Sequence, residues 1–275
     1  MGAPMALNLS RHYPITVWNR SPHKYAPLLR AGAKAGATPS HVVQDSDVIF
    51  MMLFDTIAIN DIFDGFKTAL AGKTLVNAGS VPEEFSHHLA AEVSQVGGQF
   101  VEMPVSGSQI PAEKGQLVGL LGGDGDVIEK VRPVLEPMIS AAVHCGPIGY
   151  GLRTKNAVNL YLTALTVGLA ESANLARAQG LDLGVLREVL NTGPMASAYS
   201  HIKISKIIDH DWSTQAAIKA CYYSSDLICN AAEASGVRSP LAQLCRSMYA
   251  EATDAGFGEE DLIAIIKILS GSPPK

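Results

Sequence analysis

Residues 15–24 read ITVWNRSPHK, a short apolar run that ends in a polar turn. Immediately upstream, residues 1–9 read MGAPMALNL, a glycine turn that leads directly into an apolar segment with helical spacing. Short apolar runs bounded by turn residues are typical of buried strands, and a helical segment is expected to follow the turn. The order helix, strand, turn, helix therefore predicts a sheet built from alternating strands and helices.

This alternation continues to about residue 146. Apolar runs rich in Val, Ile, Leu and Met alternate with helical segments, and continuous apolar strands predict a parallel sheet with helices on both faces. The expected strands are Ile15–Trp18, Val48–Leu53, Thr74–Val76, Gln99–Glu102, Gln116–Gly122 and Ala142–Cys145. The expected helices are Ala3–Arg11, His23–Ala31, Thr56–Phe63, Pro82–Gln95 and Asp124–Met138.

From Gly149 onward the sequence has helical periodicity and few alternating apolar runs. A cluster of Gly and Pro at 145–151 marks the boundary. We therefore expect an α/β Rossmann-type domain over residues 1–147 and an all-α domain over residues 148–275. The expected helices of the second domain are Lys155–Ala178, Leu183–Leu190, Ala198–Ile208, Ser213–Ala234, Pro240–Ala255 and Glu259–Leu269.

The composition excludes several functional classes. The net charge of −5 provides no positive field for nucleic acid or an anionic membrane, so neither is expected as a partner. The longest apolar runs fall short of the ~20 residues of a membrane span. The four cysteines form no C-x-x-C pair and the eight histidines no H-x-x-x-H pair. We therefore expect no metal site, and reduced thiols in a cytoplasmic compartment.

The first glycine and the turn at 19–24 predict a nucleotide cofactor. A dinucleotide-binding G-x-G-x-x-G motif follows a strand and opens a helix, and Gly2 could be its third glycine. At the end of the next strand, NAD sites place an acidic residue against the ribose 2′-hydroxyl. This chain has Asn19, Arg20 and Ser21 there, with Lys24 beyond. These groups can hold a 2′-phosphate and therefore predict NADP as the cofactor, with NADPH preferred over NADH. Without the strand and helix around it, the same segment would be interpreted as a solvated basic turn.

Three segments in order carry a family resemblance: WNRSPHK at 18–24, VSGSQIPAEKGQL at 105–117 and GYGLRTKNAVN at 149–159. With them the chain resembles the β-hydroxyacid dehydrogenase family, which includes 3-hydroxyisobutyrate dehydrogenase and the glyoxylate/succinic semialdehyde reductases. The resemblance runs from residue 1 to about residue 270. It implies an NADPH-dependent oxidoreductase that interconverts a small aldehyde- or keto-acid and its hydroxyacid. It also implies a homodimer or homotetramer built through the α-helical half.

Family members begin with a strand and the pattern G-x-G-x-M-G-x-P-M-A, whereas this chain starts within it at MGAPMA. The resemblance thus implies that Gly2 and Met5 belong to the cofactor site, and we expect the first strand of the sheet to be missing. In a doubly wound sheet that strand is central, so its neighbours would have unpaired backbone groups costing ~1–3 kcal/mol each if buried. We expect a form extended upstream to be much more active.

Lys155 is the candidate proton donor. Hydride transfer to a carbonyl creates an alkoxide-like oxygen that needs a proton, and Lys155 follows a Gly-Tyr-Gly turn at the start of a helix. Asn159 lies four residues later on the same face. Spacing alone would favour an exposed lysine, but the family places its catalytic lysine in this K-x-x-x-N motif.

Ser106, Gly107 and Ser108 are the candidate substrate-binding residues. A Ser-Gly turn after a strand exposes a hydroxyl and backbone N–H groups at the strand's carboxyl end, where α/β sheets bind ligands. The composition alone would suit a plain turn. The family uses this turn for the acid group of the substrate, and we expect the same here.

Further positions match the family less closely. The family usually has Asp-x-Ser-Thr near the nicotinamide, and here Ser80 keeps a hydroxyl while Asn77 and Gly79 depart from the pattern. Met52 and Leu53 could flank the nucleotide or pack in the core. The family commonly has Lys-Asp-Leu in its C-terminal domain, where this chain has Ser225-Asp226-Leu227. The missing positive charge puts the usual small-acid preference in doubt; Arg153 or Lys219 could compensate for it.

Other functions of this fold fit less well. 6-Phosphogluconate dehydrogenase would need histidines where Leu152 and Val158 stand, and imine reductases typically replace the lysine that is present here at 155. A non-catalytic cofactor-binding or assembly module, inactive through loss of the first strand, remains the alternative from another class. Relatives acting in that way lack the catalytic lysine.

Overall fold

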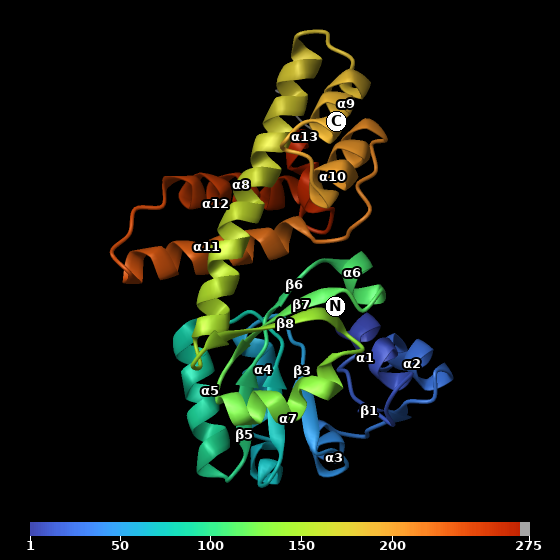
Figure 1. Ribbon diagram of the computed structural model, residues 1–275, viewed down its shortest axis with the longest axis vertical. Helices are drawn as coiled ribbons and strands as arrows, with labels where there is room; N and C mark the ends of the chain where they lie inside the picture. Colours follow the sequence, from blue (N-terminus) through green and yellow to red (C-terminus); the bar gives the residue numbers. More distant parts are fainter. Residues whose placement is uncertain (270–275) are drawn as a thin grey trace. The chain divides into compact units, whose positions relative to one another are not determined.

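The computed structural model describes residues 1–269, and the chain divides into two compact units, Met1–Lys155 and Asn156–Lys275 (Figure 1). The first unit contains all the strands found among these residues, and the second is helical. Helix α8 (Tyr150–Ala178) begins in the first unit and continues into the second. The expected fold class, a parallel α/β sheet followed by an all-α domain, is confirmed.

The larger sheet of the first unit is parallel at its start. Strand β4 lies between β3 and β5, and the register pairs Met51 with Asn77 and Asn77 with Glu102. Strand β5 then runs antiparallel to β7, which pairs antiparallel with β6 and parallel with β8. The strands are β3 (Val48–Met51), β4 (Thr74–Asn77), β5 (Gln99–Glu102), β6 (Val105–Ser106), β7 (Leu117–Gly122) and β8 (Ile139–Gly146).

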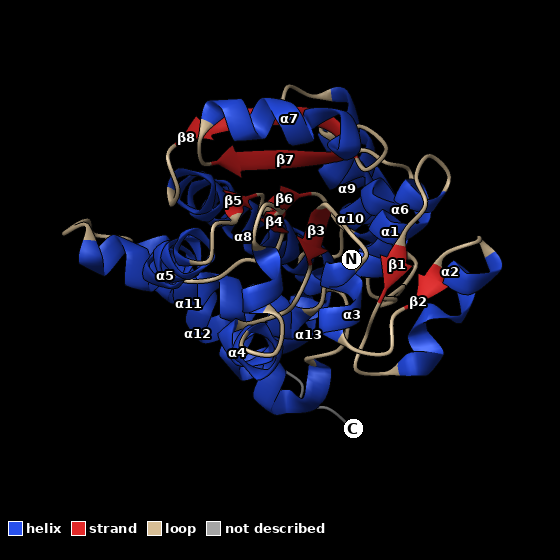
Figure 2. Cartoon of the chain, turned by 90° about the horizontal axis from the view of Figure 1, so that it is seen from below, coloured by secondary structure: helices blue, strands red, loops and turns tan. Residues whose placement is uncertain are grey.

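Two further strands form a separate parallel pair, β1 (Thr16–Val17) with β2 (Lys34–Ala35). Figure 2 shows them as two short arrows apart from the larger sheet. Among residues 1–269, β1 pairs only with β2 and β3 only with β4. In the expected strand order, one further strand would lie between β1 and β3. The sheet is therefore divided at that position.

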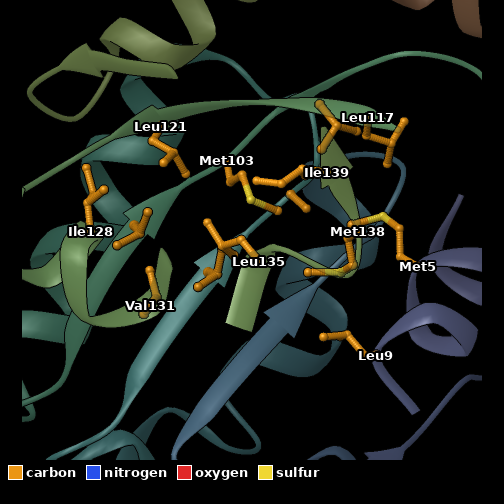
Figure 3. Close-up of a cluster of buried hydrophobic side chains, with 14 of the residues drawn as sticks. Met5, Leu9, Met103, Leu117, Leu121, Ile128, Val131, Leu135, Met138 and Ile139 are labelled. Atoms are coloured by element: carbon orange, nitrogen blue, oxygen red, sulfur yellow. The ribbon is translucent and has the colours of Figure 1, made fainter. Parts of the chain in front are cut away.

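Helices cover both faces of the sheet because buried residues alternate along its strands. In β5, Phe100 belongs to the core on one face and Val101 to the core on the other. The Val101 side is covered by α1 (Gly2–Ser10), α6 (Gln109–Glu113) and α7 (Gly125–Leu135), and Figure 3 shows Met5 of α1 beside Met138. The Phe100 side is covered by α3 (Pro39–Gln44), α4 (Thr56–Phe63) and α5 (Glu83–Gln95).

Within the first unit, η1 (Pro22–Tyr25) and α2 (Ala26–Arg30) replace the single helix expected at 23–31. The second unit packs its helices around the fully buried Tyr249. Its helices after α8 are α9 (Leu183–Thr192), α10 (Ala198–Ile208), α11 (Ile218–Ala234), α12 (Pro240–Ala252), η3 (Thr253–Phe257), η4 (Leu262–Ile265) and α13 (Ile266–Leu269). No helix of the described part combines the length and apolar character that a membrane span requires.

A buried ion pair joins α10 to the residue before η4 in the second unit. The Lys203 ammonium contacts the two carboxylate oxygens of Asp261 at 2.8 and 3.0 Å, and the two side chains are 4% and 0% exposed. Asp261 also accepts from the backbone N–H groups of Gln215 and Ile263. Burial lowers the pKa of the Lys203 ammonium. A charge removed from water in this way needs its partner.

We predict that Lys203→Ala lowers the free energy of unfolding of the helical unit by about 3–5 kcal/mol, because it leaves the Asp261 carboxylate buried without its counter-charge. The matched control is Lys219→Ala, which removes the exposed ion pair with Glu259 and should cost less than about 1 kcal/mol. Urea unfolding followed by Trp212 fluorescence in a Trp18→Phe background reports on this unit alone. Equal losses in both variants would contradict the prediction.

Candidate active site

Lys155 and the Ser106–Ser108 turn come together in the first unit. The Lys155 ammonium donates a hydrogen bond of 2.8 Å to the backbone carbonyl of Val105, and the lysine is half-buried on α8. Val105 is the first residue of β6 and directly precedes the turn. The structure thus places a cation beside the backbone that leads into the predicted carboxylate-binding turn.

The turn itself is shaped by Gly107. Its φ of +128° is a conformation that L side chains rarely adopt, and a Cβ atom there would lie 2.7 Å from Leu117 Cδ2. Ser106 and Ser108 are half-buried on either side of it. Ser108 precedes α6 without capping it through its hydroxyl. Within residues 1–269 neither serine hydroxyl is held in a hydrogen bond, so both can serve a ligand.

Asn159 lies one helical turn beyond Lys155 on α8. It is 8% exposed, and its side-chain amide donates a 2.6 Å hydrogen bond to the Ser224 hydroxyl on α11, within the second unit. Ser224 was not predicted as a site residue, because it lies 65 positions from Asn159 and no local pattern links the two. Next to it, the Ser225 hydroxyl is fully buried and has no hydrogen-bond partner in the described part of the chain.

A second residue that the sequence did not single out is Glu102 at the end of β5. Its carboxylate is fully buried and accepts from the backbone N–H of Gly151 at 2.7 Å and of Leu152 at 3.3 Å. The other carboxylate oxygen accepts from the Ser86 hydroxyl at 2.9 Å. The available signal was a carboxylate inside an apolar strand, two residues before a proline.

On the surface, Glu83 holds the first turn of α8. Arg153 donates to its two carboxylate oxygens at 2.8 and 2.6 Å and lies 4.7 Å from the centre of the Tyr150 ring. The Arg153 hydrogen bonds lower the pKa of Glu83. Lys219 is paired with Glu259 in the second unit. Arg153 and Lys219, the two cations that could replace the positive charge missing at Ser225, are therefore both paired with glutamates.

The cofactor residues predicted near the start of the chain lie at the carboxyl ends of the strands. A Cβ at Gly2 would lie 3.6 Å from Met52 Cβ, so the beginning of α1 contacts the residue after β3. Leu53 and Gly79 also approach closely, since a Cβ at Gly79 would be 2.8 Å from the Leu53 carbonyl oxygen. Ser80 is half-buried just beyond. Met5 is 3% exposed and packs in the core, so its side chain is not presented to a ligand.

The polar turn after β1 is open to solvent. Asn19 accepts from the Ser21 backbone N–H at 2.8 Å, which fixes the turn, and Arg20 and Lys24 are exposed. Among the described residues, no carboxylate forms an ion pair with either cation. Their charges are thus available to an anion.

A buried orphan donor lies at the end of β4. The Asn77 side chain is 1% exposed; its oxygen accepts from the Gly79 backbone N–H at 3.2 Å, while its Nδ2 has no partner within residues 1–269. Buried donors are rarely left without an acceptor. Together with the available cations at 20 and 24, this donor fits a polar, anionic ligand at the carboxyl edge of the sheet. No cluster of three or more His, Cys, Asp or Glu suited to a metal ion occurs in the described chain.

Known proteins resemble the whole chain. Residues 1–146 match the family described as the NAD binding domain of 6-phosphogluconate dehydrogenase. Residues 149–269 match a second family, described as "NAD-binding of NADP-dependent 3-hydroxyisobutyrate dehydrogenase". Glyoxylate/succinic semialdehyde reductase 2, chloroplastic, of Arabidopsis thaliana is 32% identical, over 99% of this chain and 77% of that protein. Mitochondrial 3-hydroxyisobutyrate dehydrogenase of Mus musculus is 27% identical, over 100% of this chain and 85% of that protein.

Solved structures share the fold. The 3-hydroxyisobutyrate dehydrogenase structure from Salmonella typhimurium superposes with a TM-score of 0.89 at 23% sequence identity. The match covers 97% of this chain and 95% of the other.

Proposed function

The chain belongs to the β-hydroxyacid dehydrogenase family and is an oxidoreductase of the NAD(P)-dependent hydroxyacid dehydrogenase class; we propose that it is an NADPH-dependent reductase of a small aldehyde- or keto-acid. The observation that supports this most is the hydrogen bond of Lys155 to the Val105 carbonyl, directly before the Ser106–Ser108 turn. It sets a proton donor next to a group suited to a carboxylate. Glyoxylate and succinic semialdehyde are the substrates named for the Arabidopsis relative.

Lys155 delivers the proton in this proposal. A bound nicotinamide would supply the hydride, and the substrate carbonyl oxygen would then carry developing negative charge. The Lys155 Nζ holds a proton for that oxygen. Its hydrogen bond to the Val105 carbonyl orients the ammonium, and such orientation of a donor before the reaction lowers the barrier.

The turn binds the acid group of the substrate. The hydroxyls of Ser106 and Ser108 and the backbone N–H groups around Gly107 offer several donors to one carboxylate. Asn159, whose side-chain amide donates a 2.6 Å hydrogen bond to the Ser224 hydroxyl within the second unit, keeps its predicted role as a substrate-binding residue in this proposal. A short acid fits because its two polar ends must reach the turn and Lys155 together.

In this proposal the residues that would hold the cofactor lie at the carboxyl ends of β1, β3 and β4. The N–H groups at the start of α1, at Gly2, would bind the pyrophosphate, as helix N-termini do in dinucleotide sites. Met52, Leu53 and Ser80 would contact the nucleotide. Met5 supports the site from the core. Asn19, Arg20, Ser21 and Lys24 hold the 2′-phosphate, which favours NADPH over NADH.

The non-catalytic alternative finds no support. The Arabidopsis and mouse relatives, which align over 99% and 100% of this chain, are named a reductase and a dehydrogenase, and Lys155 is present and hydrogen-bonded beside the turn. Their names include a chloroplastic and a mitochondrial form, so a cytoplasmic location of this chain stays a prediction.

The helical unit is the proposed dimer or tetramer interface. Leu181, Val185 and Val189 are spaced four residues apart before and along α9 and are 58%, 58% and 59% exposed. Residues four apart share one helix face. A second copy of this chain would cover such an aliphatic stripe, which is unusual on a monomer surface.

We predict that the enzyme oxidises NADPH with at least one acid from a panel of aldehyde acids and keto acids. Lys155→Ala should lower kcat by about 100- to 10,000-fold, because the alkoxide loses its positioned proton donor. The measurement is NADPH absorbance at 340 nm, with the exposed Lys114→Ala as the control. Turnover by the Lys155→Ala variant within twofold of the wild type would refute the proposed role.

We predict that Arg20→Ala raises the KM for NADPH about 10- to 100-fold, because one charge-assisted hydrogen bond to the 2′-phosphate is lost. The KM for NADH should change less than twofold. Arg30→Ala, an exposed arginine outside the turn, serves as the control. A wild-type preference for NADH would overturn this assignment of the turn.

We predict that the double substitution Val185→Glu and Val189→Glu produces a monomer, because two charges would have to be buried in the interface. Light scattering coupled to size exclusion measures the mass. Arg187→Ala changes an exposed residue of the same helix and should leave the oligomer intact. A wild-type chain that is monomeric at micromolar concentration would exclude this interface.

A further inference from the structure

Glu102 is a carboxylate enclosed in the protein, and its partners explain how it is tolerated there. Its side chain is fully buried at the carboxyl end of β5. A buried carboxylate is costly unless hydrogen bonds and positive charge replace its water. Two backbone N–H groups and one hydroxyl supply the hydrogen bonds, from Gly151, Leu152 and Ser86.

The two N–H groups belong to the first turn of α8. First-turn amides have no acceptor inside their own helix, and they carry the partial positive charge of the helix N-terminus. A Ser, Thr, Asp or Asn just before the helix usually caps them. Here the residue before Tyr150 is Gly149, which has no side chain. The cap comes instead from Glu102, 49 positions upstream of Gly151.

Two glycines leave room for the carboxylate. A Cβ at Gly151 would lie 2.5 Å from the Leu120 carbonyl oxygen and 3.0 Å from Glu102 Oε1. A Cβ at Gly122, in the neighbouring strand β7, would overlap the Glu102 carboxylate. The contact between strand and helix is therefore a close approach that larger residues would prevent.

The segment that begins at Glu102 contacts α8 at two points. Glu102 holds the N–H groups of Gly151 and Leu152, and Val105, three residues later, accepts from the Lys155 ammonium at 2.8 Å. The two points are about one turn apart on the helix, or roughly 5 Å along its axis. Fixing the first point fixes where the lysine can reach.

We infer that Glu102 is a positioning residue for Lys155: its carboxylate anchors the first turn of α8 and thereby sets the lysine ammonium against the Val105 carbonyl. This rests on the proposed proton-donor role of Lys155. Glu102 itself touches no reacting atom in this assignment, so it should act on kcat with little effect on cofactor binding.

The test compares Glu102→Ala with Glu102→Gln. The alanine variant leaves both amides without an acceptor, and we expect kcat to fall about 10- to 100-fold, as small misplacements of catalytic groups do. Glutamine keeps an acceptor oxygen of the same reach and should recover most of kcat. The KM for NADPH should stay within twofold in both variants, and the basic limb of the pH profile of kcat should shift only in the alanine variant.

A structural control separates anchoring from stability alone. Ser86→Ala removes the partner of the other carboxylate oxygen but keeps both amide bonds, so it should lower the melting temperature and leave kcat within about threefold. Gly151→Ala keeps the carboxylate but pushes the helix away, and should lower kcat as Glu102→Ala does. Circular dichroism verifies that each variant is folded.

Hydrogen exchange measures the anchor without any turnover. Glu102→Ala should speed amide exchange in residues 150–156, and Glu102→Gln should not. If the wild type reduces no acid in the panel, the proposed function fails, while unchanged exchange in Glu102→Ala would overturn the anchor by itself. The positioning role would be overturned if Glu102→Ala exchanged faster in residues 150–156 but kept the kcat of the wild type. It would also be overturned if Ser86→Ala and Glu102→Ala lost kcat equally.

Discussion

The start of helix α8, where Gly151 and Leu152 are buried, imposes the constraint on which the candidate site depends. The first-turn amides of α8 lie where the helix meets the sheet, and Gly149 before them offers no side chain to accept their hydrogen bonds. Glu102 satisfies two of them from the neighbouring strand β5. The carboxylate and the amides are each costly alone and stable together. This mutual requirement determines where α8 begins, and Lys155 is one turn from that beginning.

The chemistry of the sheet edge follows from the same arrangement. Alternating side chains of β5 fill the cores on both faces of the sheet, with Phe100 on one side and Val101 on the other. The strand is thereby held on both sides up to Glu102, its last residue. The chain then continues through Val105 into the Ser106–Ser108 turn. The end of β5, the short strand β6 and the turn after it thus carry the helix anchor, the carbonyl that binds Lys155 and the proposed carboxylate site within seven consecutive positions, 102–108.

Periodicity in the sequence was sufficient for the long elements. The helices Thr56–Phe63 and Ala198–Ile208 were predicted with their observed bounds. The short elements β2, β6, α3 and α6 were not predicted, since two to six residues carry little periodicity and their pairing depends on partners elsewhere. Motif spacing drew attention to Lys155 and Ser106, which the structure brings together. Glu102 and Ser224 escaped notice because their contacts join residues 49 and 65 positions apart. Met5 was assigned from the motif, and its burial comes from packing that no local pattern reveals.

The distribution of paired charges bears on how an acid would be bound. Arg153 is engaged by Glu83 on the surface of the first unit. Lys219 is engaged by Glu259 in the second, and position 225 carries a neutral, buried serine. The Lys155 ammonium is held against the turn that would receive the carboxylate. Under the proposed mechanism the neutral donors of the turn make most of the hydrogen bonds to the acid group. The Lys155 ammonium balances the negative charge of the acid and also delivers the proton. Both tasks require Lys155 at one position, and the anchoring of α8 by Glu102 is what defines that position.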